Sequence, residues 1–348
     1  MLNTQVQETG IELFLTESQK YIQNTDIDIA SVFNDSLTGK IEVNNVFNNF
    51  INLFGEELKN GIQSMVIILI IIVIHSILKT IIENLGNEST AKIAYFLQYL
   101  IIVTLVVNTF VDTIEIVKNA ILNIVSYMNL FVPILVTLML ASGSIVVSST
   151  SEIVLLFAIN IIGNIIESLI VPLVLISTTL SIVSNFSDKV HLSRLSKFFK
   201  SAIMWILGIV LTVFICLLSI EGTLGSSVDS MTAKTSKAAV STFIPVVGKV
   251  MGDSVDSILG SVNILKNSVG IIGVVILLGI VLIPIIRVSI LWIVIKMIAA
   301  ICEIIADDSI VKLFDEIADS YKALFGILVS VSAMFIIGIT LILRMTSV

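Results

Sequence analysis

Long runs of apolar residues, separated by short polar stretches, dominate the chain. A helix needs roughly 20 apolar residues to cross a hydrocarbon core about 30 Å thick. Five runs of suitable length are interpreted as single membrane spans: 65–82, 93–111, 130–147, 202–220 and 323–343. Two further runs, 153–183 and 268–304, are too long for one crossing each. The pattern predicts an all-α, polytopic helical membrane protein.

Proline interrupts both of the longer runs. Pro172 lies near the middle of 153–183, and Pro284 lies near the middle of 268–304. Because proline removes a backbone N–H donor and kinks or breaks a helix, each run is predicted to fold as a pair of short, broken or re-entrant helices. The total is then about nine membrane segments.

The distribution of charged residues predicts on which side of the membrane each connection between the segments lies. Short cytoplasmic loops collect Lys and Arg, and the stretch 187–200 carries four basic residues against Asp188 alone. This stretch is therefore predicted to be cytoplasmic. Residues 1–62 carry nine acidic residues and three lysines, a net charge of −6. They are predicted to form an acidic extracytoplasmic segment before a transmembrane domain at 63–348, with the C-terminus in the cytoplasm.

The four prolines of the chain, Pro133, Pro172, Pro245 and Pro284, are the predicted helix breaks, and they are regularly spaced. Pro133 and Pro172 are 39 residues apart, and so are Pro245 and Pro284. Their surroundings are also alike, since FVPILV resembles FIPVVG and IVPLVL resembles LIPIIR. One interpretation is a duplication with repeat units 129–220 and 241–343 that cross the membrane in opposite senses, as in many transporters. The alternative is chance recurrence of a common motif in an apolar chain.

Composition agrees with a membrane protein and gives no support for an enzyme. The chain is 56% hydrophobic and 13% charged, with a mean hydropathy of +1.09, whereas soluble domains contain about 25% charged residues. The two cysteines and two histidines show no metal-ligand spacing. No Walker loop, nucleophile elbow or HExxH motif occurs. We expect no enzymatic activity, no cofactor and no nucleic-acid partner.

Several polar residues lie inside the apolar runs. Ionisable groups in a bilayer are costly and mark functional sites by default. Asn160, Asn164 and Glu167 are spaced i, i+4 and i+7, so they share one helix face, which should look into a bundle or a water-filled path. Arg287 and Lys296 are further candidates for a conduit or for contacts between helices. A pair between Glu167 and either cation, holding two halves together, is an equally good interpretation.

The stretch 232–262 is too polar for a membrane span but keeps a helical stripe. Its apolar residues recur at intervals of three and four, as in an amphipathic helix. A helix beginning near Thr242 would place Pro245 in its first turn, where proline is tolerated. Such a helix lies on the outer membrane face, or packs within an assembly or lines a pore. The residues predicted for assembly are Lys234, Phe243, Pro245, Gly248, Lys249, Asp253, Lys266 and Asn267.

This stretch also carries a family resemblance. TAK at 232–234, FIPVVG at 243–248, and LKN at 265–267 followed by Gly270 resemble the signature region of the stage III sporulation protein AE family of endospore-forming bacteria. FVPILVTLMLASG at 131–143 is similar too, and the likeness extends roughly over 60–348. The chain departs from the family at its start, because MLNTQVQETG lacks the features of the signal sequence that members usually carry.

The resemblance implies a cellular role. Members lie in the mother-cell membrane around the forespore, in a trans-envelope complex with other proteins of the same operon, including an ATPase and ring-forming proteins. The complex resembles a channel or secretion apparatus that supports forespore development after engulfment. This chain would serve as a scaffold or permease-like conduit, in the lipid bilayer and as a homo-oligomer. The alternatives are a stand-alone secondary transporter with a site at the broken helices, and a structural membrane anchor.

Overall fold

A computed structural model describes residues 11–22, 29–38, 43–84, 88–142, 144–186, 192–243 and 247–345. Within these ranges the chain is helical and contains no strand. Helix α2 (Ile11–Gln19), the 3₁₀ turn η1 (Lys20–Ile22) and α3 (Ile29–Thr38) are short. The remaining elements are α4 (Val43–Asn84), α5 (Glu88–Ala141), α6 (Ile145–Ile165), the π-helical turn η2 (Ile166–Ile170), α7 (Val171–Phe186), α8 (Ser193–Phe243), α9 (Val247–Ile305) and α10 (Asp308–Met345).

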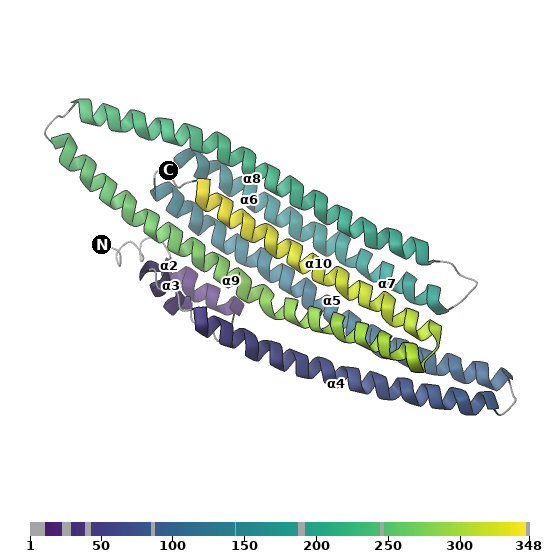
Figure 1. Cartoon of the computed structure of the whole chain (residues 1–348). Coiled ribbons are helices and arrows are strands. Elements are labelled where there is room, and N and C mark those ends of the chain that lie inside the picture. The colour runs from purple at the N-terminus through teal and green to yellow at the C-terminus, as the bar shows by residue number, and fades with distance from the viewer. Residues whose placement is uncertain are drawn as a thin grey trace.

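The long helices lie side by side in an elongated bundle (Figure 1). Helix α8 runs along one edge and α4 along the opposite edge, while α10 packs against α9, α8, α7 and α5. At the end of the bundle that holds the C-terminus, α8 and α9 extend past the other helices and converge as a hairpin (Figure 1). We call the ends of these two helices, residues 232–243 of α8 and 247–262 of α9, the α8–α9 hairpin.

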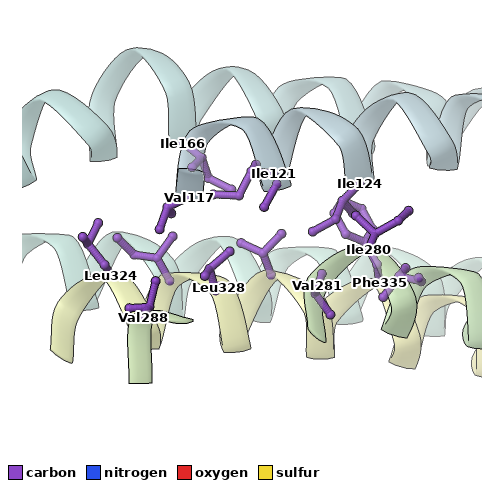
Figure 2. Close-up of a cluster of buried hydrophobic side chains, with 14 of the residues drawn as sticks. Val117, Ile121, Ile124, Ile166, Ile280, Val281, Val288, Leu324, Leu328 and Phe335 are labelled. Carbon is purple, nitrogen blue, oxygen red and sulfur yellow. The ribbon is translucent and has the colours of Figure 1, made fainter. Parts of the chain in front are cut away.

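The centre of the bundle is filled with apolar side chains. Figure 2 shows aliphatic and aromatic groups from α5, η2, α9 and α10 pointing toward one another. All of them are buried: Val117, Ile121, Ile124, Ile166, Ile280, Val281, Val288, Leu324, Leu328 and Phe335. Interiors of this kind are packed as densely as organic crystals. This part of the bundle therefore holds α5, η2, α9 and α10 together and offers no polar path between them.

Helices α5 and α9 approach each other closely at Gly273. A Cβ atom built on Gly273 would lie 2.3 Å from Cζ of Phe131, which is completely buried. The Tyr127 hydroxyl donates a hydrogen bond to the Gly273 carbonyl oxygen at 3.3 Å. Tyr127 and Phe131 stack with ring centroids 5.8 Å apart. A glycine at this position thus lets α9 lie directly against an aromatic pair on α5.

Six helices among the described residues are long and apolar enough to cross a membrane. They are Phe54–Ile81, Tyr99–Ala141, Thr150–Ser184, Ser193–Ile220, Gly260–Ile305 and Asp308–Arg344. Inside a bilayer, a single chain segment satisfies its own backbone hydrogen bonds only as a helix, which agrees with these long uninterrupted elements. The predicted all-α polytopic architecture is confirmed. The predicted count of about nine segments is not, because neighbouring segments merge into longer helices.

The prolines do not break the helices as predicted. Pro133 lies inside α5, Pro284 lies inside α9, and the chain stays helical through Pro172. A proline removes one hydrogen bond and costs about 3 kcal/mol, which the many other hydrogen bonds and packing contacts of a long helix outweigh. Pro172 follows the π turn η2, in which the Val171 N–H donates to the Ile166 carbonyl five residues back. Pro245 lies outside the described residues.

The merged helices change the predicted topology. Because 150–184 and 260–305 are one helix each, with α8 between them, they run in the same direction along the bundle. The opposite crossing of the two units therefore does not hold, while the duplication itself stays a prediction. If each of the six helices crosses once, both ends of the membrane domain lie on one side, not on opposite sides as the count of nine implied.

Candidate functional site

The outer surface of the bundle has apolar faces along its two edge helices. The large exposed side chains in the middle of α4 are aliphatic, and those in the middle of α8 are aliphatic, Met or Trp, with small residues such as Thr212 and Cys216 exposed between them. The main contributors are Val66, Ile67, Ile70, Val73, Ile74 and Ile77 on α4, and Met204, Trp205, Ile209, Val213 and Leu217 on α8. Lipid tails are as apolar as these side chains, so both faces suit direct contact with the hydrocarbon core.

Between these faces, α5 and α6 carry a polar surface. On α5, the exposed residues recur at intervals of three and four, which aligns them in one stripe. Neighbouring polar residues of α6 and η2 extend this surface. We call it the α5/α6 polar face; it consists of Asp112, Glu115, Lys118, Asn119, Asn123, Ser126 and Asn129 on α5, and Asn160, Asn164, Glu167 and Ser168 on α6 and η2.

Direct contacts join the two halves of this face. The side-chain amides of Asn129 and Asn160 donate to each other's Oδ1 atoms, at 3.2 and 3.1 Å. Lys118 Nζ lies 2.9 Å from Glu167 Oε1, with the two side chains 39% and 41% exposed. Gly163 brings the helices together, since a Cβ there would lie 2.8 Å from Val125 Cγ2. The α5/α6 polar face is therefore one continuous surface.

The π turn η2 shapes the lower part of this face. Glu167 and Ser168 lie within it, and the Ser168 hydroxyl donates to Asn164 Oδ1 at 2.9 Å. A π turn adds a residue to the helical turn, which changes the direction of the side chains that follow, and such turns occur frequently at functional sites. The structure thus groups all three polar residues predicted on this helix, Asn160, Asn164 and Glu167.

The predicted pairs between Glu167 and the cations of α9 are wrong. Glu167 meets Lys118, whereas Arg287 Nε lies 4.0 Å from Glu57 Oε2 and Lys296 Nζ bonds Asp315 Oδ1 at 2.6 Å. The physical reason is the arrangement of the helices: α9 packs against α4, α5 and α10, so its cations meet acids on α4 and α10. Lys296 therefore lies apart from the α5/α6 polar face, and Arg287 lies beside its first residue, Asp112, and not near Glu167.

Sequence reasoning missed the α5 half of the face. The two predicted spans at 93–111 and 130–147 left 112–129 as a connection, although the structure has one helix there. The signal was present in the spacing. Buried Ile114, Val117, Ile121, Ile124 and Met128 recur at helical intervals opposite the polar stripe, which is the pattern of an amphipathic helix.

The stretch 232–262 belongs to two helices and not to one. Helix α8 runs through Thr242 to Phe243, and α9 begins at Val247. The side chains of Lys234, Phe243, Gly248, Lys249 and Asp253, and all of Pro245, lie outside the described set. Farther along α9, Lys266 is 1% exposed and Asn267 is exposed.

Comparison with known proteins gives a consistent family. The family model described as stage III sporulation protein AE matches residues 27–346. Stage III sporulation protein AE of Bacillus subtilis (strain 168) is 31% identical over 295 residues, which cover 84% of this chain and 73% of that protein. No solved structure matches. On the described part of the chain, no group of three or more His, Cys, Asp or Glu residues is placed to hold a metal ion. The chain belongs to the stage III sporulation protein AE family.

Proposed function

We propose that this chain is an integral membrane component of the mother-cell-to-forespore channel, a secretion-like complex required for sporulation. We further propose that it contributes the α5/α6 polar face to a conduit shared between subunits. Family membership and the six apolar helices support a sporulation membrane protein. The single observation that carries the conduit is the polar face between two apolar ones.

The argument rests on what a bilayer tolerates. A polar group left without a hydrogen-bond partner in hydrocarbon costs on the order of several kcal/mol. Among the exposed residues of the face, Asn119, Asn123 and Ser126 lie on one stripe of α5. Charged or amide side chains at such positions normally face a bundle interior or a water-filled cavity. The α5/α6 polar face should therefore be covered by water or by another polar protein surface.

The apolar core favours a conduit between subunits. The centre of the described bundle is occupied by buried aliphatic groups (Figure 2), so a hydrophilic solute has no way through it. This disfavours the alternative of a stand-alone transporter with its own central site, since its proposed broken helices are continuous. A structural anchor, the second alternative, needs no polar face within its membrane helices.

We propose an orientation that differs from the prediction in one respect. The basic stretch 187–200 supports a cytoplasmic location for the end of the bundle where α7 meets α8. With six crossings, the acidic N-terminal segment and the C-terminus then both lie outside the cytoplasm. The α8–α9 hairpin lies on the same outer side, where the ring-forming partners would meet it. The ATPase would act at the opposite, cytoplasmic end.

Cysteine accessibility tests the conduit. In a background of Cys216→Ser and Cys302→Ser, we expect Asn123→Cys to react with a membrane-impermeant maleimide in membranes of sporulating cells. The matched control, Ile74→Cys on the apolar face of α4, should stay unlabelled because lipid covers it. Equal protection of both positions would refute a water-filled path. Labelling of Asn123→Cys that disappears when partner proteins are present would indicate a protein contact in its place.

Genetic and biochemical assays distinguish the shared conduit from the stand-alone transporter and from the structural anchor. Asn123→Leu should reduce heat-resistant spores while leaving protein level and complex recovery unchanged, because only the lining of the path changes. A normal spore count from this variant would favour the anchor. Solute uptake by the purified protein alone in vesicles would favour the stand-alone transporter. Deletion of 232–262 should abolish recovery of partner proteins in a pull-down from sporulating cells. Normal recovery would show that the α8–α9 hairpin is not needed for assembly.

A further inference from the structure

A small polar cavity lies between α4, α5 and α9, beside the pair of Arg287 and Glu57. Its volume is about 200 Å³, and a water molecule occupies about 30 Å³ in the liquid, so it has room for an ion with part of its hydration shell. Its polar lining consists of Glu57 from α4, Thr109, Asp112 and Thr113 from α5, and Arg287 from α9. Asp112 is also the first residue of the α5/α6 polar face.

The polar side chains on the α5 wall of the cavity can accept hydrogen bonds but have no free hydrogen to donate. The Thr109 hydroxyl donates to the Leu105 carbonyl at 3.1 Å, and the Thr113 hydroxyl donates to the Thr109 carbonyl at 2.8 Å. Each hydroxyl has one hydrogen and two lone pairs, so both oxygens can only accept further bonds. Together with the Asp112 carboxylate, they place three acceptors on one side of a helix, at positions i, i+3 and i+4.

The charges of the cavity do not cancel. Arg287 Nε lies 4.0 Å from Glu57 Oε2, so one guanidinium balances one carboxylate. Asp112 has no hydrogen bond or ion pair within the described part of the chain, which leaves a net charge of −1. A charge of this kind inside a membrane-spanning helix is costly unless a counter-charge compensates it. A monovalent cation restores neutrality, whereas a divalent cation usually takes more carboxylate ligands than remain here.

A buried tyrosine hydroxyl also lies beside the cavity. Tyr321 of α10 is completely buried, and its hydroxyl, which lies next to Thr113, has no partner of normal hydrogen-bond geometry among the described residues. It interacts electrostatically with both Asp112 and Arg287. The Tyr321 hydroxyl lies on the side of Thr113 away from the cavity lining, and the Asp112 carboxylate lies on the cavity side.

We infer that this cavity binds a small monovalent cation of the size of Na⁺. Asp112 supplies the charge, and the hydroxyl oxygens of Thr109 and Thr113 supply further ligands, with water completing the coordination. Arg287 stays with Glu57 and keeps the site selective for a single positive charge. The site lies within one chain, and its ligand Asp112 is also an exposed residue of the α5/α6 polar face.

Thermal unfolding of the purified full-length protein in detergent tests the site. At constant ionic strength, replacing choline chloride by NaCl should raise the Tm saturably, by a few degrees on the order expected for one bound ligand. Asp112→Asn should abolish the response to Na⁺. Glu115→Gln is the matched control, since this residue lies one turn along α5 and does not line the cavity; it should respond as the original chain does.

Two outcomes overturn the inference. The first is an equal effect of choline and Na⁺, which would show that ionic strength alone acts. The second is a full Na⁺ response in Asp112→Asn. If that variant does not fold, Thr113→Val tests the same wall without changing charge, and should shift the Na⁺ response to higher concentration. Saturable binding of ²²Na⁺ to the original chain, close to one ion per chain, is expected, and its absence would also refute the site.

Discussion

Replacement of Gly273 by alanine tests how tightly α5 and α9 are packed. The added methyl group would lie 2.3 Å from Cζ and 2.5 Å from Cε2 of Phe131. Ordinary contacts begin at about 3.4 Å, so the two helices must separate or the ring must move by about 1 Å. The ring is completely buried and stacks on Tyr127, which leaves it no free space to enter.

The expected loss follows from overpacking. Extra methyl groups in a well-packed core destabilise by about 1–3 kcal/mol, while alanine gains up to about 1 kcal/mol over glycine in a helix interior. We expect Gly273→Ala to lower the free energy of unfolding by about 1–2 kcal/mol. Phe131→Leu in the same chain should recover part of this loss, because the smaller side chain makes room for the methyl group.

Gly208→Ala is the control for this prediction. Gly208 lies in α8, and a Cβ there would have no atom within 4 Å, so the variant should be neutral or stabilised by up to about 1 kcal/mol. Unfolding in detergent, followed by intrinsic tryptophan fluorescence, compares the variants. Equal stability of Gly273→Ala and Gly208→Ala would show that the two helices do not meet as described.

Three smaller changes test contacts at other seams. Glu316→Gln should lower the unfolding free energy by about 1–3 kcal/mol, because Glu316 is part-buried and bonds Lys200 at 2.7 Å; a melt unchanged from the original would contradict this. Lys118→Met should change the free energy of unfolding by less than about 1 kcal/mol, as expected for an exposed ion pair, and should reduce spore formation. A larger loss of stability together with normal spore formation would show that the pair serves only the fold. Asn160→Ala should cost about 0.6–1.7 kcal/mol, the range of hydrogen bonds between membrane helices, and no loss in the same melt would mean that its bond to Asn129 contributes little.

The helical, membrane-spanning nature of the chain could be predicted from the sequence because it depends on local properties. Hydrophobic length and backbone hydrogen bonding are set by each segment alone. The stripe of Asn160, Asn164 and Glu167 was also readable, since residues four and seven apart always share a helix face. In the structure Asn160 and Asn164 are exposed, and Glu167 is half-buried.

The partners of individual residues could not be predicted in this way. Glu167 pairs with Lys118 of α5, and nothing in local spacing tells which helix lies beside which. Proline was equally misleading. Pro284 lies inside one continuous helix, because the packing that offsets the lost hydrogen bond comes from neighbouring helices, whose positions depend on the whole fold. The segment 112–129 of α5 was predicted as a connection and not as helix, because its polar stripe resembles a loop.

The unbroken length of α9 has a geometric consequence. Its 59 residues correspond to about 88 Å at 1.5 Å per residue, almost three times the thickness of a hydrocarbon core of about 30 Å. A helix of this length fits within the lipid only if it is strongly tilted, so an upright α9 must stand outside the hydrocarbon core over much of its length. The α9 arm of the α8–α9 hairpin would then project from the membrane, where another protein could bind it without entering the lipid.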